Sequence, residues 1–263
     1  MKVRLPVGAG SFYPAEADAL RVAIAAAFDQ ARRYEGASTK PPAGLIVPHA
    51  GYVYSGAVAA SAYRLLERHP AVRRVVLIGP SHFVAVDGLA LPSVAAFETP
   101  LGPVPLNAEA QDILAALPGC RVDDAPHRFE HSLEVQLPFL QTLVDDFAIA
   151  PLAVGRAEPE AVAAALDALG WPAEGTLLVV STDLSHYLDH GTASEHDRRT
   201  AESIVAGDYA GIADGDACGS YPLRGALLAA TRRGLAPRLL DLRTSGDTAG
   251  DRQRVVGYGA FVV

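Results

Sequence analysis

The sequence predicts a single three-layer α/β/α domain with a mixed, mostly parallel central sheet. Three apolar runs rich in Val, Ile and Leu, at residues 45–47, 75–78 and 177–180, are too short for buried helices and have the composition of central strands. Segments with helical features alternate with strands along the chain, which favours helices on both faces of the sheet. The last strands lie close together in sequence, so part of the sheet is expected to be antiparallel.

Seven helices are expected along the chain, the first of them before these strands. Pro14-Ala15-Glu16 opens an Ala-rich helix, and Pro159 marks the first turn of another. Within residues 131–144 the apolar residues recur at helical spacing. The expected helices span, in order, residues 14–33, 57–68, 108–117, 131–144, 158–169, 193–205 and 222–233.

Four further short strands complete the expected sheet. They span residues 88–94, 147–154, 239–244 and 255–263. Between them, Pro100, Pro103 and Pro105 indicate a loop. Because no repeat, low-complexity tail or linker interrupts the 263 residues, one domain over residues 1–263 is predicted.

Composition excludes several classes of function. The net charge of -8, with no segment rich in Lys and Arg, argues against nucleic acid as a partner. No apolar stretch approaches the roughly 18 residues that span a bilayer, and the N-terminus lacks the apolar core of a signal peptide. With two cysteines there is no disulfide framework. We expect a cytoplasmic protein with reduced thiols.

Each of the three central strands ends in a polar cluster that contains a histidine. His49 follows the first strand, His82 the second, and Asp183 with His186 the third. Ligands of open α/β sheets bind outside the carboxyl ends of the strands, so these side chains are candidates for one metal or catalytic site. Asp183 and His186 would share a face if a helical turn began near Ser181. Alternatively, each cluster is a cap, and Asp183 is simply a helix N-cap.

Two other segments carry residues with suitable chemistry. His131 and Glu134 are spaced i, i+3 at an expected helix start and can point at one spot, although Glu134 can also complement the helix dipole. Cys218 precedes a helix, where a thiolate is favoured and would bind iron, copper or zinc; alternatively it is a small buried apolar residue. The remaining histidines are expected on the surface: His69, His127, His190 and His196.

The candidate residues lie in short motifs that, in this combination, resemble those of the Memo family, whose bacterial and archaeal members are called AmmeMemoRadiSam system protein B. The resemblance covers the chain from residue 10 to the C-terminus. The motifs are Gly10-Ser11-Phe12-Tyr13-Pro14, Pro48-His49-Ala50-Gly51-Tyr52-Val53-Tyr54-Ser55-Gly56, Gly79-Pro80-Ser81-His82, His131-Ser132-Leu133-Glu134-Val135-Gln136-Leu137-Pro138, Ser181-Thr182-Asp183-Leu184-Ser185-His186-Tyr187 and Ala217-Cys218-Gly219.

The resemblance implies a fold similar to class III extradiol dioxygenases of the LigB type, which hold non-haem Fe(II) with two histidines and a carboxylate. It implies that His49, His82 and Cys218 bind the metal here, with Asp183 and His186 close by. A thiolate in place of the carboxylate makes the site softer, which admits copper as well as iron. The family name also implies association with an AMMECR-type protein and a radical SAM enzyme.

The first hypothesis is therefore a metal-dependent redox protein or oxygenase-like enzyme with Fe(II) or copper, or with zinc as a further option. In it His186 acts as acid or base, Asp183 orients His186 or joins the metal, and Tyr54 caps the site. His131 and Glu134 line the pocket as a proton relay. The alternatives are a metal-dependent hydrolase and a non-catalytic module that binds a peptide or protein in the same pocket.

Overall fold

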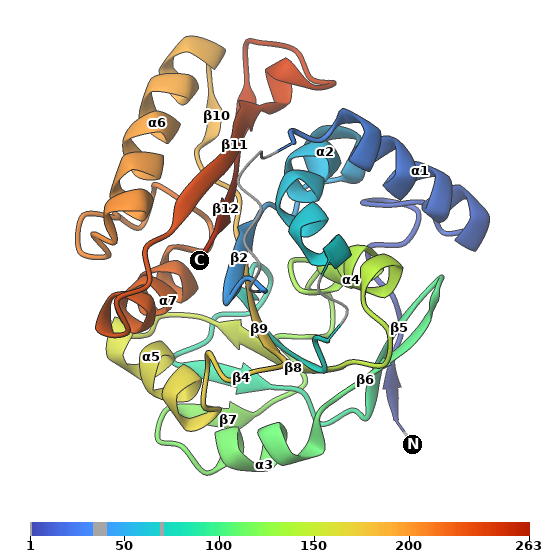
Figure 1. Ribbon diagram of the computed structural model, residues 1–263, viewed down its shortest axis with the longest axis vertical. Helices are drawn as coiled ribbons and strands as arrows, with labels where there is room; N and C mark the ends of the chain where they lie inside the picture. Colours follow the sequence, from blue (N-terminus) through green and yellow to red (C-terminus); the bar gives the residue numbers. More distant parts are fainter. Residues whose placement is uncertain (1, 34–40, 69–70) are drawn as a thin grey trace.

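The computed structural model describes residues 2–33, 41–68 and 71–263 and confirms the predicted α/β class. Its main sheet contains β2 (Gly44–Val47), β3 (Arg74–Pro80), β4 (Leu89–Leu91), β7 (Cys120–Val122), β8 (Ala148–Val154), β9 (Thr176–Ser181), β10 (His186–Leu188), β11 (Arg238–Thr244) and β12 (Val255–Val262). The strand order is β10-β12-β2-β9-β3-β8-β4-β7, with β11 paired to β12 (Figure 1).

The centre of this sheet is parallel and its flanks are mixed. Neighbouring strands β2, β9, β3 and β8 are parallel, whereas β12 joins β2 and β4 joins β8 in antiparallel fashion. Every residue of β2 and β9 is buried, as expected for strands covered on both faces. The mixed, mostly parallel sheet is thus confirmed.

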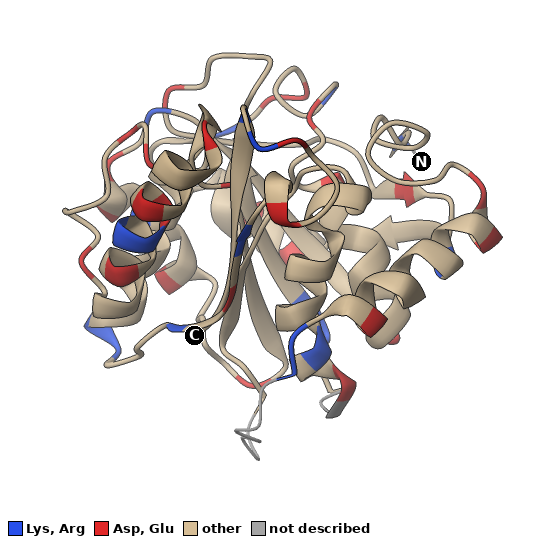
Figure 2. Cartoon of the chain, turned by 90° about the horizontal axis from the view of Figure 1, so that it is seen from above, with Lys and Arg blue, Asp and Glu red and all other residues tan. Residues whose placement is uncertain are grey.

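In the described part of the chain, seven α-helices cover the sheet: α1 (Ala17–Gln30), α2 (Tyr52–Tyr63), α3 (Ala108–Ala115), α4 (Leu137–Leu143), α5 (Pro159–Ala168), α6 (His190–Ala206) and α7 (Ser220–Arg232). Helices α1, α2 and α4 pack on one face, and α3, α5, α6 and α7 on the other (Figure 1). Each face of the sheet has its own apolar core. Leu45 and Val47 point into the core beside α1, α2 and α4, and Ile46 points into the core on the other face, because side chains alternate along a strand. Most charged residues lie on the outer helices and loops (Figure 2).

The expected proline-containing loop is instead a β-hairpin, and that prediction was wrong. β5 (Ala96–Thr99) and β6 (Gly102–Pro105) pair antiparallel, and β1 (Val3–Arg4) joins β5 in a separate sheet ordered β1-β5-β6. Pro103 and Pro105 are tolerated there because β6 is an edge strand. An edge strand has no neighbour on its outer side, so a missing backbone N–H on that side removes no hydrogen bond of the sheet.

Three helix predictions also differ from the structure near the candidate site. The expected helix over 131–144 begins only with a 3-10 turn at Glu134–Gln136 and continues as α4, so His131 lies in the preceding loop. No helical turn begins near Ser181, because the chain passes from β9 through an irregular segment into β10, a strand the sequence did not predict. α2 begins at Tyr52, before the expected start at residue 57.

The three strands that precede the candidate residues end at one edge of the sheet. β9 lies between β2 and β3, with Val47 opposite Ser181 and Ile78 opposite Val180. The loop with His131 packs closely over β3, because a Cβ on Gly79 would lie 2.9 Å from the Leu133 side chain and 3.1 Å from Ser132 Oγ. The fold therefore brings segments near residues 49, 82, 131 and 183 together.

Among the helices of the described ranges, none is long and apolar enough to cross a membrane.

Candidate functional site

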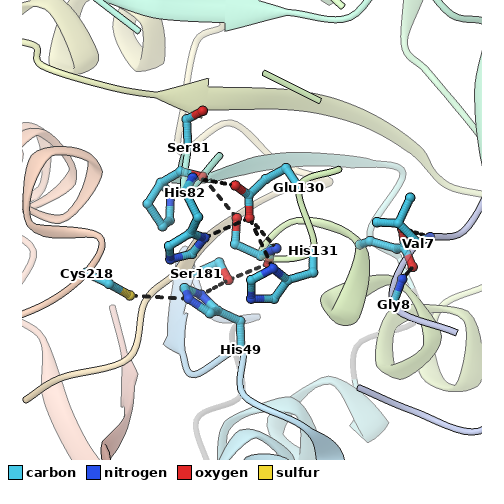
Figure 3. Close-up of polar contacts among 12 residues, drawn as sticks. Val7, Gly8, His49, Ser81, His82, Glu130, His131, Ser181 and Cys218 are labelled. Atoms are coloured by element: carbon cyan, nitrogen blue, oxygen red, sulfur yellow. Dashed lines mark hydrogen bonds and ion pairs between the residues drawn. The ribbon is translucent and has the colours of Figure 1, made fainter. Parts of the chain in front are cut away.

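The centre of the site is a group of three histidines contributed by three different segments. His49 follows β2, His82 follows β3, and His131 lies in the loop before α4. One ligand atom from each lies within 4.8 Å of those of the other two, a spacing that could hold a metal ion. The three rings face one another, and Cys218 approaches from the side of His49 (Figure 3).

The ring of His49 is fixed by a hydrogen-bond chain behind it. The Ser181 hydroxyl donates to the Ser132 carbonyl at 2.6 Å, so its oxygen accepts from His49 Nδ1–H at 2.9 Å and from the Gln136 amide at 2.8 Å. Burial, followed by the nearby His82, lowers the pKa of His49 to about 3. His49 is therefore neutral at pH 7, with its lone pair on Nε2.

His82 is held by a carboxylate that the sequence analysis missed. His82 Nδ1–H donates to Glu130 Oε1 at 2.9 Å, and the His82 backbone N–H donates to Glu130 Oε2 at 2.6 Å (Figure 3). Although burial raises the pKa of Glu130, the hydrogen bonds and charge of His82 outweigh it and lower the value to about 2. Burial lowers the pKa of His82, but Glu130 outweighs it and the pKa is raised overall.

His131 differs from the other two histidines because no hydrogen bond fixes its tautomer. Its ring stacks on Phe12 at 4.0 Å and on His82 at 5.0 Å between centroids. Its buried Nδ1 has no hydrogen-bond partner in the described part of the chain, and Glu130 Oε1, at 3.6 Å, is too far away to accept a hydrogen bond. Burial, followed by the nearby His49, lowers the pKa of His131 to about 4.

Cys218 lies directly beside His49. Its Sγ is 3.2 Å from His49 Nε2 and accepts the Asp183 backbone N–H at 3.3 Å. Two ligands of one ion, at about 2.1 Å for nitrogen and 2.3 Å for sulfur, lie roughly 3.1–3.6 Å apart for angles of about 90–110°. Burial, followed by the charge of Asp183, raises the pKa of the Cys218 thiol, which is therefore protonated unless a cation replaces the proton.

Asp183 and His186 lie at the same edge but do not share a helical face. The buried Asp183 carboxylate accepts the His49 backbone N–H at 2.8 Å. Burial raises the pKa of Asp183, although the His49 N–H opposes this. His186 is exposed on β10, and its Nδ1–H donates to the Leu184 carbonyl at 2.8 Å, which leaves Nε2 free.

Glu134 lies in a different network from the one expected for a relay with His131. Its buried carboxylate accepts hydrogen bonds from Arg4 Nη1 at 2.6 Å and from the Tyr13 hydroxyl at 2.5 Å. It also accepts the backbone N–H groups of Val7 and Gly8 at 2.8 and 2.7 Å. Glu134 thus links the N-terminal segment to the segment that precedes α4. The carboxylate beside the histidines is Glu130.

The remaining predicted residues have mixed outcomes. Tyr54 is 40% exposed and lines, together with Phe12, a groove of about 640 Å³ beside the site. His127 was expected on the surface, which is wrong: it is buried and bonded to the Ala90 carbonyl through Nε2. His190 and His196 are partly exposed, and His69 lies outside the described residues.

Glu130 and Ser181 are the residues that sequence reasoning missed. Glu130 directly precedes His131, and an acidic residue beside a motif histidine was a usable signal. Ser181, the last residue of β9, gave no signal of its own because a strand-end serine is common. Its role depends on the parallel pairing that sets it opposite Val47.

Comparisons with known proteins agree on one family. The model of the family described as Memo-like protein matches residues 4–262. A MEMO1 family protein of Methanopyrus kandleri is 35% identical over 98% of both chains. One of Thermotoga neapolitana is 37% identical over 97% of this chain and 98% of its own.

One solved structure shows the same fold at low sequence identity. The crystal structure of an uncharacterized protein from Escherichia coli K12 matches with a TM-score of 0.56 and 15% identity. The match covers 85% of this chain and all of the other. At this identity the likeness concerns the fold alone.

Proposed function

The chain belongs to the Memo-like protein family, and from that premise we propose that it binds iron(II) or copper and works as a metal-dependent redox or oxygenase-like protein. The ligands in this proposal are His49, His82 and Cys218. The observation that carries it is the orientation of the two histidines: each donates Nδ1–H to a buried acceptor, which leaves the Nε2 lone pair as the ligand atom. The Cys218 sulfur lies at ligand spacing from one of these atoms.

The donor chemistry of these residues fits a transition metal. Imidazole suits iron, copper and zinc, and a thiolate favours the softer of these ions. The neutral His49 offers its Nε2 lone pair, which in the metal-free protein faces the Cys218 thiol, and the buried Nδ1 of His131 has no partner among the described residues. A metal bound here would supply electron transfer and open positions for O2 or substrate.

The surrounding residues have proposed roles that follow from their contacts. His131, neutral and without a fixed tautomer, is suited to take up or deliver a proton inside the pocket. His186 presents a free Nε2 at the exposed edge and is the proposed acid or base there. Asp183 holds the His49 backbone and adds negative charge beside Cys218. The proposed cap, Tyr54, lines the adjoining groove together with Phe12, which stacks on His131.

Metal content tests this proposal directly. Protein purified without oxygen is expected to contain about one iron or copper ion per chain by mass spectrometry, and His49→Ala is expected to lose it. His190→Ala is the matched control, because His190 bonds Thr244 outside the centre. A wild-type protein that takes up neither metal, or unchanged uptake in His49→Ala, would contradict the proposal.

A metal-dependent hydrolase is the second candidate, favoured by the three-histidine group. Three histidines are a ligand set of catalytic zinc, in which a bound water becomes a nucleophile near pH 7. In that case His131, rather than Cys218, is the third ligand. Zinc in the purified protein together with hydrolysis of ester or phosphate substrates would favour this reading over the first.

The association with an AMMECR-type protein and a radical SAM enzyme, implied by the resemblance, stays a prediction, and so does the alternative of a non-catalytic binding module. Binding of a partner that survives Cys218→Ser would favour the module. Loss of binding in that variant, with the fold intact, would count against it.

A further inference from the structure

Two buried carboxylates, Glu130 and Glu134, lie four residues apart in the segment that precedes α4 and make different contacts. Glu130 is 1% and Glu134 0% exposed. Glu130 contacts His82 and Ser132, whereas Glu134 contacts Arg4 and the N-terminal segment. We propose that Glu130 is the positioning residue that fixes His82 as a metal ligand. This inference rests on the proposed metal-binding function and assigns a role to a residue that the sequence motifs did not include.

The Glu130 carboxylate accepts hydrogen bonds from three donors. Its Oε1 accepts His82 Nδ1–H and the Ser132 backbone N–H, both at 2.9 Å, and its Oε2 accepts the His82 backbone N–H at 2.6 Å. One carboxylate therefore binds both the ring and the backbone of His82. These two contacts fix the side-chain torsions of His82 and join β3 to the loop that carries His131.

The contact with the ring also selects the tautomer. An ionised carboxylate is an acceptor only, so the hydrogen of a neutral His82 ring must be on Nδ1 and its lone pair on Nε2. A carboxylate behind a ligating histidine also increases the basicity of the ligand atom. His49 has a serine hydroxyl in the corresponding position, so the two histidines are oriented alike but His82 has the stronger acceptor.

An amide cannot replace this carboxylate. If the oxygen of Glu130→Gln took the place of Oε1, its NH2 would face the His82 backbone N–H. If its NH2 took that place, it would face the Ser132 N–H and donate to His82 Nδ1, which drives the ring hydrogen to Nε2. Either orientation sets a donor against a donor, and the second blocks the ligand atom.

The first test measures the tautomer without any metal. Nitrogen NMR shifts of the metal-free protein, at a pH where His82 is neutral, are expected to show hydrogen on Nδ1 in the wild type. In Glu130→Gln the tautomer with hydrogen on Nε2 is expected to rise. A wild-type His82 with its hydrogen on Nε2 would overturn the inference.

The second test measures metal affinity with Co(II) alone, titrated into metal-free protein against a chelator. Glu130→Gln is expected to bind Co(II) about 10- to 100-fold more weakly, the usual effect of removing such a partner. Glu134→Gln is the matched control, a buried carboxylate on the same loop without a histidine contact, and its affinity is expected to stay within about twofold of wild type. Equal losses in both variants, or none in Glu130→Gln, would overturn the inference.

A conservative variant covers the case in which Glu130→Gln does not fold. Glu130→Asp keeps the charge on a shorter side chain and is expected to keep the Nδ1–H tautomer with an intermediate loss of Co(II) affinity. Wild-type affinity in a folded Glu130→Asp, with His82 no longer hydrogen-bonded, would contradict the positioning role. A wild-type protein that binds no Co(II) would contradict the proposed function itself, and the tautomer would still decide the role of Glu130.

Discussion

In the proposed metal site, the rings of His49 and His82 are oriented by residues behind them. Ser181 and Glu130 accept the Nδ1–H groups, and both acceptors are buried. His131 lacks such a partner in the described chain, so the three histidines are not equivalent. This difference is the physical reason for assigning ligand roles to two of them and a proton-transfer role to the third.

Removal of the Ser181 hydroxyl is expected to weaken metal binding. Ser181→Ala takes away the acceptor of His49 Nδ1–H, so the ring loses its fixed tautomer and orientation, and metal affinity should fall about tenfold. Calorimetric titration of the metal-free protein measures this. Ser61→Ala is the control, because this buried serine bonds Asp241 and not the site. An unchanged affinity in Ser181→Ala would contradict the role of the hydrogen bond.

The Cys218 thiol is expected to make metal binding depend on pH. Burial raises the pKa of Cys218, so the thiol is protonated in the metal-free site, and binding as thiolate releases one proton. Affinity should therefore rise about tenfold per pH unit through this proton over about pH 7 to 9. His49, with a pKa near 3, releases none there.

Cys218→Ser isolates the contribution of the thiol to that pH dependence. The slope of log affinity against pH should be smaller by about one in this variant, because the proton released by the thiol is lost. Identical slopes in wild type and Cys218→Ser would show that the sulfur does not bind the metal.

At the scale of elements, the site depends on parallel strands that end together. β2, β9 and β3 place residues 49, 183 and 82 at one edge, and the loop before α4 adds His131. The N-terminal segment closes the arrangement, because Glu134 holds residues 4–13 and Phe12 of that segment stacks on His131. We therefore expect these contacts to hold the segment in place by packing, without a part in proton transfer.

Loss of the Glu134 contacts is expected to lower the free energy of unfolding and to leave metal affinity unchanged. Glu134→Gln leaves the buried Arg4 without its charged partner, which typically destabilises a protein by about 3–5 kcal/mol. Urea unfolding measures the change. Asp18→Asn breaks an exposed ion pair with Arg21 on α1 and should leave the unfolding midpoint unchanged. Equal unfolding midpoints for Glu134→Gln and wild type would contradict the stabilising role of the contact between Glu134 and Arg4.

The predictable parts of the fold are those with strong local signals. The buried strands around Ile46, Ile78 and Val180 were recognisable because runs of β-branched residues and leucine are typical of strands covered on both faces. The hairpin with Pro103 was not, since only the edge position of β6 makes proline acceptable. Tertiary contacts also outweighed helical spacing before α4, where the loop with His131 packs against Gly79.

The part of the site that directly follows the central strands could be predicted from the sequence. His49 and His82 could be placed at one edge because each follows a central strand. Cys218 was a candidate ligand from its place before a helix, and the family resemblance strengthened that prediction. Glu130 lies beside a motif histidine, but its contact with His82 spans 48 residues and depends on how the loop crosses β3, so its partner could not be predicted from the sequence. The i, i+3 spacing of His131 and Glu134 was misleading, because that spacing describes neighbours only on a regular helix.

For the whole molecule, we expect the fold to form without the proposed metal. The sheet is covered by helices on both faces, and the histidines lie at its edge outside the two apolar cores. The metal-free protein should therefore unfold cooperatively. A metal that binds only the folded chain then adds about 2.7 kcal/mol at about 100 times its Kd.

Denaturant unfolding with and without metal measures this linkage. The unfolding midpoint of the wild type should rise with metal concentration, and that of His49→Ala should not. A metal-free wild type without a cooperative transition would contradict the independence of the scaffold. A midpoint that does not respond to saturating metal would contradict binding to the folded state.

X-ray absorption of the iron- or copper-loaded protein decides whether Cys218 is a ligand, because it reports the ligand atoms themselves. We expect one sulfur at about 2.3 Å beside nitrogen ligands. That sulfur should disappear in Cys218→Ser and persist in His131→Ala. A spectrum with nitrogen and oxygen ligands alone, unchanged in Cys218→Ser and altered in His131→Ala, would contradict it and assign the third position to His131.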